Sequence, residues 1–343
     1  MRVLFSAISA YSAVKYNNCL VKYTQLGNTG IAVSEIGFGA WAIGGPVDLF
    51  GIPVGWGIVD DRESERAIHR ALDLGVNFFD TANVYGSGHS EELLGRSLQG
   101  KSAILATKVG NARKEGRPIK DFSQAHIRAQ LEASLRRLKR ETIDIYQLHN
   151  PPPEIWRSEE TFTLLQQLKR EGKIRAAGVS ISTMEEGIHL IETQKVNVLQ
   201  VLFNILNQAP VDKLIPLAKE SQIGLIARVP LASGLLTGKF QANHQFPNDD
   251  NRKNYLTPRR LTEALEKVER LKQMVQDSGY TVQQVGLAFL LRFPVVPIPG
   301  AKSSAHVEQN VTATEVQLPD HLFDAIREEF ASYNFYLRYK VHV

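Results

Sequence analysis

Short apolar runs alternate with amphipathic segments along most of this chain. The runs are rich in aliphatic and β-branched residues, which is typical of buried strands. The segments between them place apolar residues at helical spacing, as in 64–74, where Ala67, Ile68 and Ala71 fall on one face. The strands predicted in this way are 35–39, 77–79, 103–106, 143–148, 174–179, 198–202, 223–227 and 295–298.

Helices are predicted after most of these strands. The first, 64–74, opens with acidic residues and is followed by Gly75, as a helix dipole and a left-handed cap prefer. The others are predicted near 89–98, 123–138, 160–170, 184–193, 211–219 and 303–311. A strand followed by a helix, repeated eight times, is the pattern of a (β/α)8 TIM barrel. A doubly wound parallel sheet in two domains is the alternative.

Some predicted segments are additions to the eight strands and eight helices of a minimal barrel. Residues 22–33 contain a Gly-Asn-Thr-Gly turn between two short runs, which predicts an N-terminal β-hairpin that covers the bottom of the barrel. A long polar loop at 230–257 and extra C-terminal helices near 259–277, 281–292 and 320–330 complete the chain. We expect one barrel domain over 22–343, preceded by a poorly ordered extension over 1–21. The apolar residues of that extension leave a signal peptide as a second interpretation.

Composition narrows the class of protein. The 343 residues are 43% hydrophobic and 22% charged, and the formal net charge is only +4 with basic residues scattered along the chain. This balance disfavours a nucleic-acid-binding protein, and no apolar stretch reaches the roughly 20 residues that span a bilayer. The single cysteine, Cys19, allows neither an internal disulfide nor a cysteine-based zinc site. We therefore expect a cytoplasmic protein without a bound metal.

Polar side chains that can exchange protons follow three of the predicted strands. Asp80 and Tyr85 follow the second strand, Lys108 follows the third and His149 follows the fourth. An aspartate after a strand is more often a helix cap or a turn residue, and a lone histidine, lysine or tyrosine is most often structural. In a parallel barrel, however, the carboxyl ends of all the strands meet on one face, so these four should lie together.

Together the four suit the protonation of an oxygen that becomes negative during a reaction. Tyrosine and lysine have ordinary pKa values of about 10 and 10.4, so neither is a ready proton donor near neutrality. A lysine cation beside the phenol should lower the pKa of Tyr85. Asp80 would keep Lys108 charged, and His149 would orient a carbonyl beside Tyr85.

These residues stand in motifs that resemble the aldo/keto reductase family. The motifs are F-D-T-A-N-V-Y-G-S-G-H-S-E at 79–91, A-T-K-V at 106–109 and Y-Q-L-H at 146–149, with V-S-E-I-G-F-G-A-W-A-I-G-G at 33–45. The resemblance runs from about residue 22 to 331. It implies a (β/α)8 barrel that binds NADP(H) and reduces aldehydes or ketones. It makes Tyr85 the general acid, tuned by Lys108 and Asp80, with His149 positioning the carbonyl.

The candidate cofactor site lies late in the chain. Residues 298–303 end the eighth strand and open a helix, so main-chain N–H groups and the charge of Lys302 could meet a 2′-phosphate. The resemblance assigns further contacts along the cofactor, from nicotinamide to adenosine. They are Ser180 and Gln200 at the carboxamide, Arg228 at the nicotinamide ring, Pro230, Leu231, Ser233, Gly234 and Lys239 around the pyrophosphate, and Gly300, Ser303, His306, Gln309 and Asn310 at the adenosine end.

The chain departs from the commonest family pattern at two nicotinamide contacts. Ile181 follows Ser180 where an asparagine is frequent, and Arg228 stands where an aromatic ring usually stacks. A guanidinium can stack too, and its charge should favour NADPH over NADP+. Trp41 and Trp56 are expected in the wall of the substrate pocket, with loops near 112–120 and 230–257. The basic run 252–260 is expected to be a solvated surface.

Three functions follow from these observations. The first is an NADPH-dependent reductase of a small-molecule carbonyl compound. The second is a non-catalytic member of the same fold, such as an ion-channel accessory subunit, which keeps the cofactor but works by binding a partner. The third is an unrelated barrel enzyme, such as an isomerase or lyase acting on a phosphorylated sugar. The sequence leaves the carbonyl substrate and the oligomeric state open.

Overall fold

Eight parallel strands form one sheet in a computed structural model that describes residues 21–49, 52–115 and 117–339. Neighbouring strands follow the order β14-β13-β12-β11-β10-β7-β6-β3. In chain order they are β3 (Phe38–Gly39), β6 (Phe78–Asp80), β7 (Ile104–Val109), β10 (Ile143–His149), β11 (Ile174–Ser180), β12 (Val198–Leu202), β13 (Gly224–Arg228) and β14 (Val296–Pro297). All eight predicted strands are confirmed, and the first and last are shorter than expected.

The first and last strands meet and close the sheet. The main-chain N–H of Gly37 donates to the carbonyl of Pro297 at 2.9 Å, and that of Gly39 donates to Pro299 at 3.0 Å. Gly39 also forms a parallel bridge with Gly300. A Cβ atom at Gly39 would lie 2.5 Å from the carbonyl oxygen of Ile298, so this seam requires a glycine. The fold is a (β/α)8 barrel, and the doubly wound alternative is excluded.

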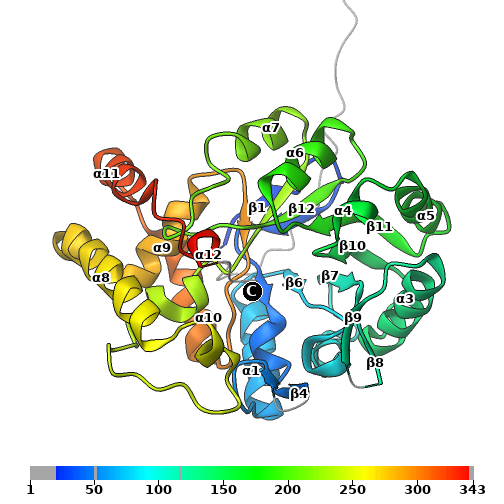
Figure 1. Ribbon diagram of the computed structural model, residues 1–343, viewed down its shortest axis with the longest axis horizontal. Helices are drawn as coiled ribbons and strands as arrows, with labels where there is room; N and C mark the ends of the chain where they lie inside the picture. The colour runs from blue at the N-terminus through cyan, green and yellow to red at the C-terminus, as the bar shows by residue number, and fades with distance from the viewer. Residues whose placement is uncertain (1–20, 50–51, 116, 340–343) are drawn as a thin grey trace, which may run out of the picture.

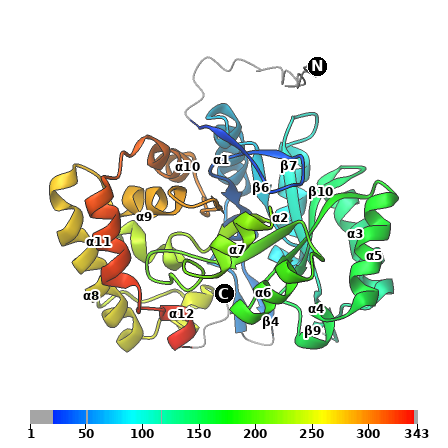
Figure 2. The same cartoon turned by 90° about the horizontal axis from the view of Figure 1, so that it is seen from above.

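Helices surround the strands, as Figures 1 and 2 show. Asp60 caps the first helix by accepting hydrogen bonds from the main-chain N–H groups of Arg62 and Glu63, and the apolar face predicted from the sequence is buried. The predicted helices are α1 (Asp61–Asp73), α2 (His89–Ser97), α3 (Gln124–Leu138), α5 (Glu159–Arg170), α6 (Met184–Glu192), α7 (Leu214–Glu220), α8 (Pro258–Val275), α9 (Val282–Leu291), α10 (Ser304–Val311) and α11 (Asp320–Phe330). Two short helices were not predicted, α4 (Pro153–Trp156) and α12 (Phe335–Arg338).

The N-terminal hairpin covers one end of the barrel, as expected. It pairs β1 (Tyr23–Gln25) with β2 (Ala32–Ser34) in antiparallel register. Leu26 and Ile31 join a buried cluster with side chains from seven barrel strands: Phe78, Ala106, Ile145, Ala176, Val198, Ile226, and Val296 with Ile298. Figure 2 shows this dark blue segment at the end opposite to α4, β9 and α12. The bottom of the barrel is therefore filled, which leaves the other end for a ligand.

Two further hairpins lie outside the barrel sheet, and neither was predicted. One pairs β4 (Val47–Leu49) with β5 (Ile52–Val54), and the other pairs β8 (Asn111–Lys114) with β9 (Arg117–Lys120). The expected loop at 112–120 is therefore wrong, because this segment forms a cross-strand ladder of its own.

Over the described ranges, no helix is long and apolar enough to cross a membrane. Residues 1–20 lie outside the described residues, so the expected extension, its signal-peptide alternative and the domain boundary at residue 22 stay predictions.

Candidate active site

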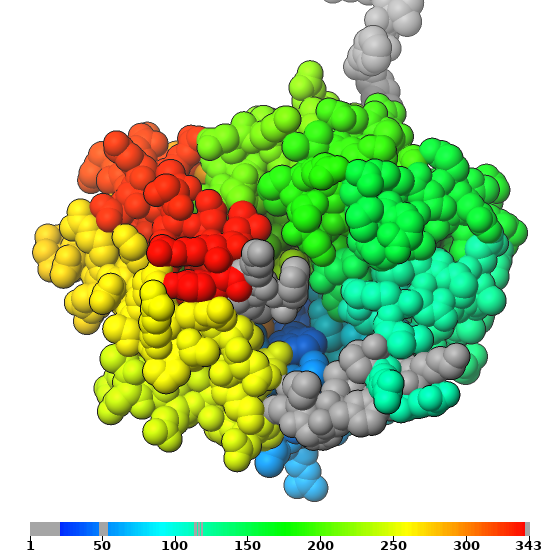
Figure 3. Space-filling model, in the orientation of Figure 1, coloured from blue at the N-terminus to red at the C-terminus, as the bar shows by residue number. Residues whose placement is uncertain are grey.

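Three of the four predicted catalytic residues, Asp80, Lys108 and His149, lie on three neighbouring strands. In the sheet, β7 lies between β6 and β10, and the register sets Asp80 opposite Ala106 and Gln147 opposite Lys108. Their side chains therefore meet where the strands end. Figure 3 shows a hollow on this face, with blue N-terminal residues at its floor between yellow, red and green segments.

Lys108 is the centre of the arrangement. Its Nζ donates to Asp80 Oδ1 at 2.5 Å, to the carbonyl of Thr81 at 2.7 Å and to Tyr85 Oη at 3.1 Å. The side chain is fully buried. Burial lowers the pKa of Lys108, but the charge of Asp80 and the contact with Tyr85 outweigh it, so the pKa is raised overall. Lys108 is therefore protonated at neutral pH, and its ammonium group has three acceptors.

Asp80 is held by two amides as well as by the lysine. Its Oδ2 accepts from Gln147 Nε2 at 3.0 Å and from Gln200 Nε2 at 2.8 Å. Gln147 was not among the predicted site residues, although it precedes His149 by two positions and so shares its face of the strand. The amide nitrogen of Gln200 is used by Asp80, which leaves its carbonyl oxygen as the group for the predicted carboxamide contact.

Tyr85 opens a tight turn, η2 (Tyr85–Gly88), at the mouth of the barrel. Gly86 has φ +59°, and a Cβ atom there would lie 1.9 Å from the carbonyl oxygen of Gly44. The chain can therefore place Tyr85 here only because a glycine follows it. The ring of Trp41 packs edge-on against the phenol with centroids 4.7 Å apart, so Trp41 lies beside the candidate acid.

The pKa of Tyr85 is raised, and the expected lowering is wrong. Burial of the phenol is the largest influence and raises the pKa, while Lys108 lowers it by a smaller amount. The expected contribution of the lysine is present with the expected sign, but desolvation of the phenolate exceeds it. Tyr85 therefore keeps its proton at neutral pH, which is the state that a general acid needs.

His149 lies against Tyr85 and is neutral. The two ring centroids are 6.0 Å apart. Burial holds the pKa of His149 well below its usual value, and the cations Lys108, Lys120 and Arg228 lower it further. A neutral imidazole donates one hydrogen bond, which suits the orientation of a carbonyl oxygen next to the phenol.

The segment after β14 lies beside this site. Gly300 bridges to Gly39, and its carbonyl accepts from Asn310 Nδ2 at 3.4 Å. Asn310 in turn accepts from Gln283 at 2.9 Å and is buried, so it braces the turn rather than facing solvent. Ser303 caps α10 by accepting from the N–H of His306 at 3.3 Å. Gln309, on the same helix, is exposed.

Basic side chains lie close together near the start of α10. Lys239 keeps an exposed surface, but partial desolvation and the charges of Arg252 and Lys302 lower its pKa. The pKa of His306 is lowered by burial and by Lys239 and Lys302. Mutual lowering means that these groups lie within electrostatic reach of one another, as residues that bind a phosphate would. Their chemistry fits the phosphate groups of a nicotinamide dinucleotide.

Arg252 is buried, so the expected solvated surface is wrong at this residue. Its guanidinium donates to both carboxylate oxygens of Asp250, at 2.9 and 3.1 Å from Nε, and to the carbonyl of Ser233 at 3.2 Å. It also lies 4.8 Å from the ring centroid of Trp56. A paired guanidinium stacked on aromatic rings can be buried, and here it fastens the 230–257 loop. Lys302 Nζ donates to the carbonyl of Trp56, so this tryptophan lies beside the basic residues after β14.

The remaining predicted contacts line the ends of the strands and the loop after β13. Ser180 Oγ donates to Asn150 Oδ1 at 3.2 Å, and Arg228 Nη2 donates to the carbonyl of Ile181 at 3.4 Å. In the loop, the hydroxyl of Ser233 bonds to the hydroxyls of Tyr336 at 2.9 Å and Tyr255 at 3.1 Å. Both the hydroxyl and the main-chain carbonyl of Ser233 are thus used within the protein. Pro230 and Leu231 are buried, while Gly234 is partly exposed and Lys239 is exposed.

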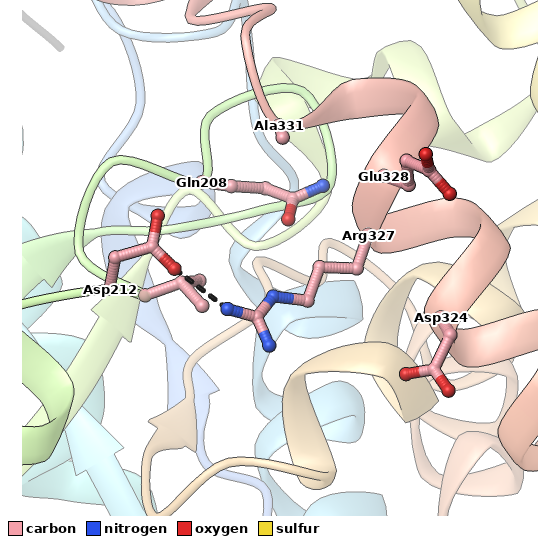
Figure 4. A pocket seen from close by; sticks show the side chains of 7 residues that line it. Gln208, Asp212, Asp324, Arg327, Glu328 and Ala331 are labelled. Carbon is pink, nitrogen blue, oxygen red and sulfur yellow. Dashed lines mark hydrogen bonds and ion pairs between the residues drawn. The ribbon is translucent and has the colours of Figure 1, made fainter.

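A separate pocket of about 210 Å³ lies between α11 and the loop before α7. Figure 4 shows Arg327 reaching across it to Asp212, with which it forms an ion pair at 2.7 Å. None of the predicted site residues lines this pocket. The chemistry described above therefore belongs to the barrel mouth.

Comparison with known proteins identifies the class. The sequence profile of the Aldo/keto reductase family matches residues 35–329, so the chain belongs to this family. It is an oxidoreductase that acts on carbonyl compounds with a nicotinamide cofactor.

Individual relatives agree with this assignment. The chain is 33% identical over 298 residues to aldo-keto reductase YhdN of Bacillus subtilis, covering 84% of this chain and 87% of the relative. The structure of a glycerol dehydrogenase from Gluconobacter oxydans matches with a TM-score of 0.77 and 31% identity, covering 92% and 95% of the two chains. An aldo/keto reductase from Klebsiella pneumoniae, solved with NADP and acetate, matches with a TM-score of 0.67 and 25% identity, covering 90% and 96%.

Proposed function

We propose that the protein reduces an aldehyde or ketone to an alcohol with NADPH. The observation that carries the proposal is the buried Asp80, Lys108 and Tyr85 chain, in which one ammonium group bonds to both the carboxylate and the phenol. His149 completes the set at the same mouth. The proximity of the two rings supports a role for one protonated acid and one neutral hydrogen-bond donor that act on the same carbonyl oxygen.

Each residue has a separate part in the proposed reaction. His149 orients the carbonyl oxygen, and Tyr85 gives its proton to that oxygen as negative charge develops there. Lys108 stabilises the phenolate that remains, because its ammonium group lies 3.1 Å from Tyr85 Oη. Asp80, with Gln147 and Gln200, keeps the ammonium in place. The nicotinamide supplies the hydride when the cofactor is bound.

The cofactor assignment rests on the chemistry of the far end of the groove. Lys239, Lys302 and His306 gather where a dinucleotide would carry its phosphates, and Arg228 lies near the tetrad where the ring would lie. A homologous structure from Klebsiella pneumoniae holds NADP, which has the additional 2′-phosphate that such a cluster would bind. We therefore propose NADPH as the preferred reductant and the predicted residues as its contacts.

The test measures loss of NADPH absorbance with a reactive aromatic aldehyde in the wild type and in Tyr85→Phe. The variant removes only the phenolic hydroxyl, so we expect kcat to fall by about 10²–10⁴-fold while NADPH affinity is retained. NADPH binding without turnover, over a broad aldehyde panel, would favour the non-catalytic alternative. Tight binding of a sugar phosphate without NADPH binding would favour the isomerase or lyase alternative.

A further inference from the structure

The turn that carries Tyr85 lies against a second turn of the barrel mouth. Gly44 follows the short helix η1 (Ala40–Ile43), and its carbonyl oxygen fits against Gly86, where a Cβ atom would lie only 1.9 Å away. A Cβ atom at Gly44 would in turn lie 3.0 Å from the carbonyl carbon of Tyr85. The same helix η1 carries Trp41, whose ring packs against the phenol. The two turns touch through their main chains, so a shift of Gly44 would move the backbone of the candidate acid.

His89, the first residue of α2, holds the carbonyl group of Gly44. Its Nδ1 lies 3.0 Å from this carbonyl oxygen, and its Nε2 lies 3.1 Å from Asp61 Oδ2 on α1. Burial raises the pKa of Asp61, but hydrogen bonds with Arg96 and His89 outweigh it, so the pKa is lowered overall and the carboxylate is ionised at neutral pH. Carbonyl and carboxylate oxygens only accept hydrogen bonds, so each ring nitrogen must donate for both bonds to form.

The two bonds of His89 lie in different surroundings. The side chains of His89 and Asp61 are 31% and 41% exposed, so water screens their ion pair. Gly44 is buried, so its carbonyl group would lose this partner where water cannot easily replace it. Ser90, the next residue of α2, ties the same segment down with a buried bond from its Oγ to the carbonyl of Ala40 at 2.9 Å. The bond to Gly44 is therefore the one through which His89 acts on the barrel mouth.

We propose that His89 is a positioning residue for the reduction and holds Tyr85 in place through Gly44. The inference rests on the proposed reductase function and adds a residue outside the four candidate catalytic side chains. Both ring nitrogens of His89 are used within the protein, so its effect on the reaction is indirect. Proton transfer from Tyr85 requires the phenol within hydrogen-bond reach of the carbonyl oxygen, so a small displacement of the turn slows the chemical step.

Two amide variants separate the two bonds of His89. The amide nitrogen of asparagine can take the place of Nδ1, and that of glutamine can take the place of Nε2. His89→Asn can therefore keep the bond to Gly44, whereas His89→Gln can keep only the bond to Asp61. We expect kcat of His89→Gln to fall by about 10–10²-fold with the Kd of NADPH unchanged, while His89→Asn retains most of the wild-type kcat.

A second histidine on a neighbouring helix provides the matched control. His69 lies on α1, and its Nε2 lies 3.2 Å from the carbonyl oxygen of Ser97, the last residue of α2. His69→Asn removes this contact with α2 at the end away from Tyr85. Its kcat should equal that of the wild type.

The outcomes separate the two proposals. A wild-type kcat in His89→Gln, an equal loss in His89→Asn and His89→Gln, or an equal loss in the control would overturn the positioning role while the reductase function stands. If the wild type reduces no aldehyde, the reductase function fails, and hydrogen exchange followed by mass spectrometry tests the positioning itself. The amides of Tyr85 and Ser87 donate to the carbonyls of Ala82 and Val84 within the turn. Faster exchange of these amides in His89→Gln but not in His89→Asn would support the role, and equal rates would overturn it.

Discussion

Replacing Asp80 by asparagine should leave Lys108 as a buried cation without a counter-ion. The carboxylate accepts hydrogen bonds from three donors, Lys108, Gln147 and Gln200. An asparagine offers one acceptor oxygen and an NH₂ group, so at least one of these donors would face another donor. The change is nearly isosteric, which confines its effects to charge and hydrogen bonding.

The expected loss of stability can be estimated from the 2.5 Å contact between Lys108 and Asp80. At an effective dielectric constant of about 20, Coulomb attraction at this distance is about 7 kcal/mol. Removing one partner of a buried pair costs about 3–5 kcal/mol, because the other charge stays desolvated. We therefore expect Asp80→Asn to lower the free energy of unfolding by about 4 kcal/mol. Removing the cation as well, in Asp80→Asn with Lys108→Met, should recover about half of this loss.

Urea unfolding at pH 7, followed by circular dichroism, measures all the variants. Asp212→Asn is the control, since it breaks an exposed ion pair with Arg327 and should cost less than about 1 kcal/mol. The reasoning is refuted if Asp80→Asn costs no more than this control. It is also refuted if the double variant is less stable than Asp80→Asn alone, since the unpaired charge would then not be the cause.

Two further predictions concern the cofactor and pH. Arg228→Tyr removes a charge that opposes the positive oxidised nicotinamide, so we expect NADP+ affinity to rise about tenfold relative to NADPH in fluorescence titrations; an unchanged ratio would remove this role for Arg228. Because the pKa of His149 lies below its ordinary value of about 6.5, the ring is neutral at pH 7 and stays neutral down to about pH 6.5. Over this range, kcat/KM for a neutral aldehyde should not depend on the protonation of His149. Activity should fall only at lower pH, and a fall centred near 7 that disappears in His149→Asn would contradict the assignment.

The proximity of the candidate catalytic residues could be predicted because each of them follows an apolar run. A parallel barrel brings the ends of all strands together whatever their order in the sheet. The positions of the strands were therefore enough to predict that Asp80, Lys108 and His149 lie close together. The hydrogen bonds from Gln147 and Gln200 to Asp80 could not be predicted in this way. They form because the three side chains point into the barrel at the same level along its axis. That level is set by the stagger of β6, β10 and β12, which no local sequence pattern encodes.

Burial of charged groups was the main failure of prediction. Arg252 stands in a run of basic residues, and its burial depends on Asp250 and on Trp56, which is distant in the sequence. The predicted direction of the pKa shift of Tyr85 was wrong for the same reason. The motif reveals the nearby lysine, but it does not reveal that the phenol is desolvated. The hairpin of β8 and β9 was missed because its residues are polar, with no apolar alternation to reveal a ladder.

The seam between β3 and β14 has a consequence for the synthesis of the chain. Gly37 and Gly39 receive their partners only when residues 297–300 have left the ribosome, about 260 residues later. At roughly 5–20 residues per second this interval lasts about 13–50 s. During this interval, one edge of the first strand stays unpaired. The apolar residues of the N-terminal hairpin also lack their contacts with the last strands, which belong to the same buried cluster. The nascent chain must therefore stay free of aggregation for most of its own translation.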